Sequence, residues 1–343
     1  MTKLSPNHWE NCTCGAAHCP QSVYLSDQSP QDKPWDIHRY QADQVQRIYA
    51  QAEKFERYAQ RIGKCSGVLR FAWFLSAEGE ARLRLGGAQF CRCRYCPVCQ
   101  WRRALMWQAR FYKALPALLS AYPTHRWLFL TLTVQNPPVG CLRETLGDMT
   151  KAFKRLTDRT VWHYVDGFLR TTEVTLPGGE LGHHYAHPHF HILLMVKPSY
   201  FTGGGYVKQA RWSEVWKECL RADYQPVVHV QAVKPNKRKS TAIEPIEETG
   251  IQTAIQETLK YSVKPSDMVK NGEWFRTVTE QTHKLRFVAS GGLLKDILKS
   301  ETSITEEDML LKDGEKEDAE SVGLGNIFFN WQPTDRRYKK IDK

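Results

Sequence analysis

The sequence contains no run of about 18 or more apolar residues, so we expect no membrane-spanning helix. Its opening segment, residues 1–8, lacks the apolar block of a secretory signal peptide. We therefore expect a cytoplasmic protein, in which thiols stay reduced. The ten cysteines are then better interpreted as metal ligands or buried thiols than as disulfides.

Acidic residues are fewer than basic ones, with 37 Asp and Glu against 48 Lys and Arg. The formal net charge is +11 and the sequence pI is about 9.1. This excess favours a polyanionic partner such as nucleic acid. A basic surface that serves only solubility is the alternative.

Three histidines alternate along residues 187–196, a segment whose second half is apolar and β-branched. Side chains on a strand alternate between its faces, so His187, His189 and His191 are expected on one side and Phe190 on the other. Two imidazoles placed in this way can bind one cation. Histidines that only form hydrogen bonds, or a structural zinc site, remain alternative interpretations.

A second strand is predicted over residues 168–176, and Gly178-Gly179 predicts a turn before the histidine strand. Two strands joined in this way should pair antiparallel, which brings Glu173 beside the histidines. A site that combines imidazole and carboxylate ligands and leaves coordination positions of the metal open suits Mn²⁺ or Mg²⁺.

The segment Cys96-Pro97-Val98-Cys99 has the two-residue gap that lets both thiolates bind one tetrahedral Zn²⁺. Cys91 or Cys93 is the candidate third ligand, and Cys65 the fourth. The helical patterns of residues 40–62 and 101–121 flank these cysteines, so the zinc is expected to be structural.

Basic residues suggest where DNA phosphates are bound. Arg102 and Arg103 follow the cysteines on a predicted helix, although a solvated face explains them equally well. A basic loop that contains proline follows later in the chain and supplies Lys234, Lys237, Arg238 and Lys239.

Glu257, Tyr261 and Lys264 recur at helical spacing after residue 253. Glu257 and Tyr261 are four residues apart and share a face, and Lys264 joins them if the helix continues to Pro265. Surface helices often show this spacing, so the pattern alone is weak evidence for catalysis.

The periodicities together predict an α+β fold, with a central antiparallel sheet flanked by helices and a zinc-stapled helical segment before it. We expect an irregular arm over residues 1–38, the helical zinc-binding segment over 39–122 and a domain built on the central sheet over 123–299. Residues 300–343 are expected to be an acidic linker and C-terminal tail.

From residue 60 to residue 298 the chain resembles the rolling-circle replication initiators (Rep proteins) of small bacterial plasmids, in their single-tyrosine subfamily. These belong to the HUH endonucleases, named for two histidines around a bulky residue, here His189-Phe190-His191. Residues 129–133 are similar to the family's first motif. Residues 260–264 are similar to the tyrosine motif, and Glu257 stands at the position of a second catalytic residue.

The resemblance implies a metal-dependent nickase that acts on single-stranded or hairpin-extruded origin DNA. Tyr261 would attack a phosphodiester, form a 5′-phosphotyrosyl link and free a 3′-OH primer, while Glu257 would assist strand closure and Lys264 would offset phosphate charge. His189 and His191, with Glu173 or His187, would bind Mn²⁺ or Mg²⁺. Host helicase and polymerase are the expected partners.

Other functions remain open at this point. Within the HUH superfamily, a transposase or a mobilisation relaxase is the alternative, and cutting specificity on an origin hairpin against a transposon end separates them from an initiator. From a different class, a zinc-containing DNA-binding regulator without catalysis fits the same composition.

Overall fold

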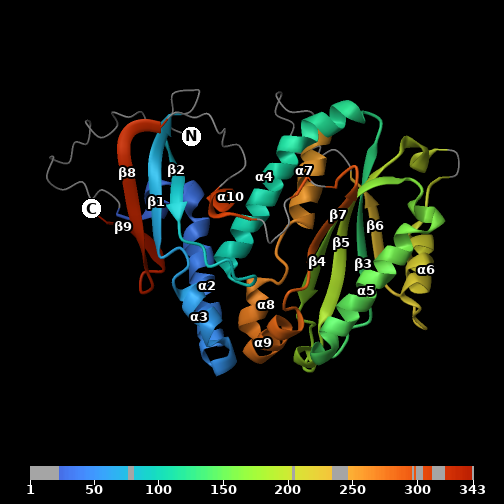
Figure 1. Ribbon diagram of the computed structural model, residues 1–343, viewed down its shortest axis with the longest axis horizontal. Helices are drawn as coiled ribbons and strands as arrows, with labels where there is room; N and C mark the ends of the chain where they lie inside the picture. The colour runs from blue at the N-terminus through green and yellow to red at the C-terminus, as the bar shows by residue number, and fades with distance from the viewer. Residues whose placement is uncertain are drawn as a thin grey trace. The chain divides into compact units, whose positions relative to one another are not determined.

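The computed structural model describes residues 23–75, 81–202, 205–233, 246–295, 297–298, 304–310 and 321–341 (Figure 1). The chain divides into two compact units. The first combines Met1–Arg102 with Thr305–Lys343, and the second is Arg103–Ile304. None of the helices in the described ranges combines the length and the apolar character needed to cross a bilayer.

The first unit is built on a four-stranded antiparallel sheet of order β2-β1-β8-β9. Its strands are β1 (Val68–Leu75), β2 (Ala81–Ala88), β8 (Ser321–Gln332) and β9 (Arg337–Ile341). Its helices are α1 (Leu25–Gln28), α2 (Pro34–Ala50), α3 (Glu56–Gly63) and α10 (Glu306–Leu310). The two ends of the chain therefore build one unit.

Helix α2 links the two ends through buried polar contacts. Its apolar side chains recur at helical spacing and are buried, as in Trp35 and Val45. Asp43 accepts a hydrogen bond of 2.7 Å from the indole of Trp331 in β8. The backbone amide of Tyr338 in β9 donates to Oδ1 of Asp36 in α2 at 2.9 Å. Because the donor and the acceptor of each bond are buried, removal of either one would leave a buried polar group unsatisfied.

These elements correct four predictions. Residues 25–28 and 34–38 are helical rather than irregular, and the expected helix over 40–62 is interrupted at residues 51–55. The acidic tail predicted for 300–343 instead contains β8, which pairs with β1, and β9, which pairs with β8. The first unit thus ends near residue 102 and includes the C-terminal strands, whereas we predicted a boundary at 122.

The second unit has a five-stranded antiparallel sheet of order β6-β3-β5-β4-β7, with the histidine strand at its centre. The strands are β3 (Arg126–Thr133), β4 (Val165–Thr175), β5 (His187–Val196), β6 (Val228–Ala232) and β7 (Val288–Gly292). The helices are α4 (Pro97–Ala121, which starts in the first unit), α5 (Leu142–Thr157), α6 (Gln209–Leu220), α7 (Ile246–Thr258), α8 (Pro265–Lys270) and α9 (Gly272–Gln281). The predicted α+β fold is confirmed.

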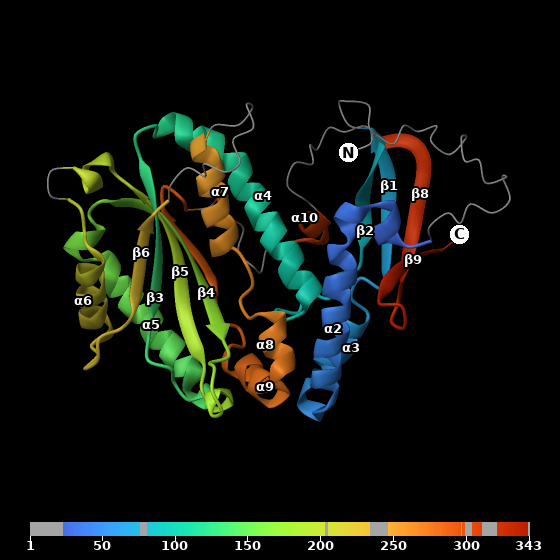
Figure 2. The same ribbon diagram turned by 180° about the vertical axis from the view of Figure 1, so that it is seen from behind.

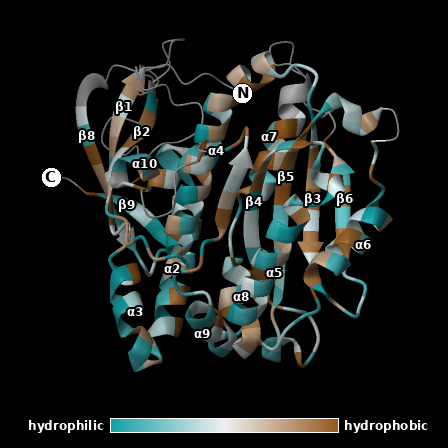
Figure 3. Cartoon of the chain, turned by 45° about the vertical axis from the view of Figure 1, so that its right-hand side comes forward, coloured by the Kyte–Doolittle hydropathy of each residue, from teal (hydrophilic) through white to brown (hydrophobic). Residues whose placement is uncertain are grey.

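Helices cover both faces of this sheet. Figures 1 and 2 show α5 and α6 on one side and α7 and α4 on the other. Because β5 is covered on both faces, it is almost continuously buried, and Figure 3 shows hydrophobic residues along it and its neighbours. Phe190 points toward Phe153 of α5, with ring centroids 6.1 Å apart, so the neighbouring histidines point toward the α7 side.

Candidate metal and tyrosine site

Glu173 and two histidines meet on the α7 face of the sheet. Antiparallel pairing of β4 with β5 sets Glu173 opposite His189. The Nε2 atoms of His189 and His191 lie 3.1 and 2.9 Å from Oε2 of Glu173. One ligand atom from each of the three residues lies within 4.8 Å of the others, and all three side chains are buried.

The electrostatics of this group suit a cation. Burial by itself would raise the pKa of Glu173, but hydrogen bonds from His189 and His191 hold it well below its usual range. The second carboxylate oxygen, Oε1, is buried and accepts no hydrogen bond from the described residues. A buried anionic oxygen without a donor, beside two imidazole nitrogens, is a donor set that fits a divalent cation.

His187 lies outside this group. Its Nδ1 is 2.7 Å from the side-chain oxygen of Asn136, and the side chain is only half-buried. The geometry therefore favours Glu173 over His187 as the third ligand.

The tyrosine segment follows α7, which ends at Thr258, so the predicted helix through Tyr261 is wrong. Pro265 instead occupies the first turn of α8, where its missing N–H costs nothing. Tyr261 lies in the irregular link between α7 and α8.

Two hydrogen bonds hold this link against β4 beside the metal-ligand group. The Thr171 hydroxyl donates to the Thr258 carbonyl at 2.6 Å, and the Val174 amide donates to the Ser262 carbonyl at 2.9 Å. The backbone next to Tyr261 therefore pairs with the residue next to Glu173.

The charged neighbours of Tyr261 occupy different positions. The Lys264 ammonium is 3.9 Å from Oε1 of Glu173 and remains half-exposed. Glu257 is exposed at the end of α7 and forms an ion pair with Lys260. Burial raises the pKa of Tyr261 to about 12, so its hydroxyl is a neutral phenol at pH 7.

Four cysteine sulfurs converge in the first unit. Cys65 follows α3, Cys91 follows β2, Cys96 precedes α4, and Cys99 lies in its first turn. The Cys65–Cys99, Cys91–Cys99 and Cys65–Cys96 sulfur distances are 3.6, 3.6 and 3.7 Å. Four thiolates around a tetrahedral zinc, each at about 2.3 Å, are separated by about 3.8 Å. Burial raises the pKa of the Cys96 thiol, so a cation is needed to ionise the cluster.

Cys93 is not part of this cluster. Its sulfur is 3.8 Å from the Cys91 carbonyl oxygen, and its backbone amide donates to the Cys91 sulfur at 3.5 Å. An amide that donates to a thiolate stabilises the charge of a metal ligand. Cys91, rather than the alternative Cys93, completes the set of four.

A model of the replication-protein family matches residues 82–339, which is most of the chain. The chain belongs to this family. The resemblance to plasmid rolling-circle replication initiators is thereby confirmed, because the family is described as a replication protein and the curated relatives are named protein Rep. A protein Rep of Streptococcus pneumoniae is 32% identical over 337 residues, covering 96% of this chain and 97% of the relative.

A protein Rep of Lactiplantibacillus plantarum is 36% identical, over 79% of this chain and 80% of the relative. One of Bacillus amyloliquefaciens is 32% identical, over 84% of this chain and 86% of the relative. No solved structure matches the chain.

The prediction that Arg102 contacts DNA is wrong. Its side chain is only 2% exposed, donates from Nε to the Met309 carbonyl at 2.7 Å, and packs over the ring of Trp35. A guanidinium held in this way cannot reach a phosphate. Arg103 is half-buried and remains a candidate. The other predicted DNA contacts, Lys234, Lys237, Arg238 and Lys239, lie outside the described residues.

The sequence patterns did not reveal one residue that orients a candidate metal ligand. The Thr131 hydroxyl lies 3.3 Å from Nδ1 of His191, its cross-strand partner. A hydrogen bond on the outer nitrogen fixes the ring and leaves Nε2 for the metal. Thr131 stands in the middle of residues 129–133, the segment similar to the family's first motif. This position was the sequence feature that could have identified it.

Proposed function

We propose that this protein starts plasmid replication by nicking one strand of its origin with Tyr261. The observation that carries the proposal is the Val174–Ser262 backbone hydrogen bond, which sets the tyrosine segment beside the ligand Glu173. A nucleophile and a cation site on the same side of one sheet are the two components that phosphodiester cleavage requires.

His189, His191 and Glu173 would hold Mn²⁺ or Mg²⁺, and Thr131 would fix the ring of His191. When bound, the cation polarises the scissile phosphate and stabilises the charge that develops on it. Lys264, whose ammonium reaches toward Oε1 of Glu173, would offset further phosphate charge.

Tyr261 would form the new bond to phosphorus while the bond to the 3′ oxygen breaks. The phenol loses its proton and the departing 3′ oxygen gains one, so the products are a 5′-phosphotyrosyl link and a free 3′-OH. That hydroxyl would prime a host polymerase, and a host helicase would unwind the duplex ahead of it. The substrate is single-stranded or extruded from a hairpin, because only an unpaired strand lets the phosphate approach both groups.

Glu257 would act after the first cut. It lies at the end of α7, exposed and outside the buried metal-ligand group, where it can accept a proton from a water. This base would allow hydrolysis of the closing strand without a second covalent link. The four cysteines would hold a structural Zn²⁺ that does not take part in the reaction.

A nicking assay on supercoiled plasmid tests the proposal. With the cognate origin and added Mn²⁺ or Mg²⁺, we expect open circles that carry covalently attached protein, and neither product without the metal. Tyr261→Phe should abolish the adduct while DNA binding persists. Metal-independent nicking, or an adduct that survives in Tyr261→Phe, would contradict the mechanism. Origin binding without any nicking would instead favour the DNA-binding regulator.

A further inference from the structure

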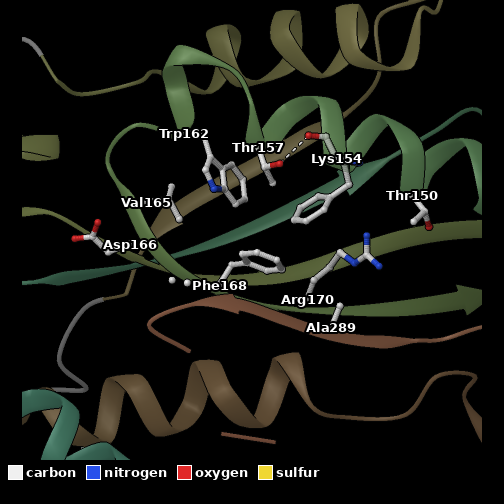
Figure 4. A pocket seen from close by; sticks show the side chains of 12 residues that line it. Thr150, Lys154, Thr157, Trp162, Val165, Asp166, Phe168, Arg170 and Ala289 are labelled. Atoms are coloured by element: carbon white, nitrogen blue, oxygen red, sulfur yellow. Dashed lines mark hydrogen bonds between the residues drawn. The ribbon is translucent and has the colours of Figure 1, made fainter. Parts of the chain in front are cut away.

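A cavity lies on the face of the sheet opposite to the candidate metal site. It has a volume of about 320 Å³ and is bounded by α5, by β4 and by the edge strand β7 (Figure 4). Arg170 and Glu173 are three residues apart on β4 and therefore point to opposite faces. The cavity and the metal site are separate, and both can be occupied at once.

The cavity contains the buried cation of Arg170, which is 6% exposed. Within the described part of the chain, its Nε has no hydrogen-bond partner and no carboxylate forms an ion pair with it. Burial and the charge of Arg286 lower the pKa of Arg170 to about 10, so the guanidinium is still protonated at neutral pH. A buried charge of this kind is costly unless it is paired.

Aromatic rings compensate the charge only in part. The guanidinium carbon of Arg170 lies 4.7 Å from the ring centroid of Phe153 and 4.3 Å from that of Phe190. Cation–π contacts leave the N–H donors in the guanidinium plane unsatisfied. These donors can bind a planar oxyanion with two parallel hydrogen bonds.

The rest of the cavity is apolar and aromatic. Trp162 and Phe168 meet edge to face, with centroids 5.7 Å apart, and both remain partly exposed. Figure 4 shows Arg170 at one end of the cavity and Asp166 at the other, with Trp162 and Phe168 between them. Asp166 pairs with His125 at 2.8 Å, so it is not the counterion of Arg170.

We propose that this cavity binds a nucleotide, with its phosphate on Arg170 and its base against Trp162 and Phe168. Guanidinium groups match phosphate oxygens, and bases stack on aromatic rings whatever their sequence. Lys154 also lines the cavity and has no ion-pair partner among the described residues, so it adds a second positive charge. A peptide ending in an aromatic residue and a carboxylate is the rival occupant. The chain's net charge of +11 and its family favour the nucleotide.

Calorimetric titration of the full-length protein with deoxyadenosine monophosphate tests this proposal. Without added Mn²⁺ or Mg²⁺, we expect one saturable site per chain and much weaker binding of deoxyadenosine, which lacks the phosphate. Arg170→Gln should weaken binding at least about tenfold, because it removes charge-assisted hydrogen bonds. Ala289→Trp, which fills the cavity from β7, should abolish binding.

Exposed residues supply a matched pair of variants that avoids the risk of misfolding. Lys154→Gln should weaken binding several-fold, whereas Lys151→Gln on the same helix should not, because Lys151 pairs with Asp148 and does not line the cavity. Glu173→Gln should leave nucleotide binding unchanged, and this separates the cavity from the metal site.

Competition identifies the source of the nucleotide. The competitor is a 5′-phosphorylated single-stranded oligonucleotide. If it displaces deoxyadenosine monophosphate at a lower concentration, the cavity binds a DNA strand. If it does not displace the nucleotide, the cavity binds a free nucleotide. The proposal is overturned by the absence of saturable binding or by binding that persists in Arg170→Gln and Ala289→Trp. Loss of binding in Glu173→Gln, or tighter binding of N-acetylphenylalanine, would also overturn it.

Discussion

The buried hydroxyl of Tyr261 determines how the reaction should depend on pH. With a pKa of about 12, the phenol is almost entirely protonated at pH 7, and its phenolate fraction rises tenfold with each pH unit. Because the phenolate is the stronger nucleophile, the single-turnover cleavage rate should rise between pH 7 and 9 by up to about tenfold per unit. Quenched-flow measurement of the covalent adduct follows this rate.

DNA binding by Tyr261→Phe, measured over the same pH range, is the control because it involves no phenol ionisation. A cleavage rate that levels off below about pH 8 would show that another group limits the reaction.

Glu257 should separate the two halves of the reaction. Glu257→Ala is expected to leave the first nick within about twofold of wild type, because the exposed carboxylate lies outside the metal-ligand group. Release of the closed strand should fall by about 10²- to 10⁴-fold, the usual contribution of a general base. Gln256→Ala, at the exposed neighbouring position, is the matched control. If strand release is unchanged in Glu257→Ala, Glu257 is not the general base.

At the scale of elements, the four cysteines join the end of α3, the segment after β2 and the start of α4. Cys96→Ser should lower the zinc content below one ion per chain and reduce the thermal stability of the first unit, because binding of a structural metal contributes directly to folding. Cys93→Ser should retain one zinc, since the Cys93 sulfur lies outside the cluster. Metal analysis of both purified variants decides between them. Equal zinc loss in the two would contradict the Cys65, Cys91, Cys96 and Cys99 set.

The sequence predicts strands more reliably than links between helices. Alternation over residues 187–196 placed His189 and His191 on one face, and the turn at Gly178-Gly179 brought Glu173 opposite them, as the pairing of β4 with β5 shows. The link after α7 was missed because helical spacing continues past Thr258, while the chain turns there to pair with β4. Arg102 was misinterpreted because charge does not reveal which face of a helix packs against Trp35.

The organisation of the whole chain was the least predictable feature. The acidic composition of residues 301–320 suggested a solvated tail, yet β8 and β9 follow it. β8 pairs with β1 from the other end of the sequence, and β9 pairs with β8. Such long-range pairing depends on tertiary contacts such as Trp331 with Asp43, which no local pattern contains. The same contacts make residues 321–341 part of the first folding unit.

Two compact units with separate cores should unfold in two separable transitions. In differential scanning calorimetry of the full chain, Cys96→Ser should lower only the transition of the first unit. Leu193→Ala, at a fully buried position in the central strand β5, should lower only the other. The expected loss for Leu193→Ala is about 2–5 kcal/mol, or on the order of 10 °C. If each variant shifts both transitions equally, the chain unfolds as one cooperative body and the division near residue 102 has no thermodynamic counterpart.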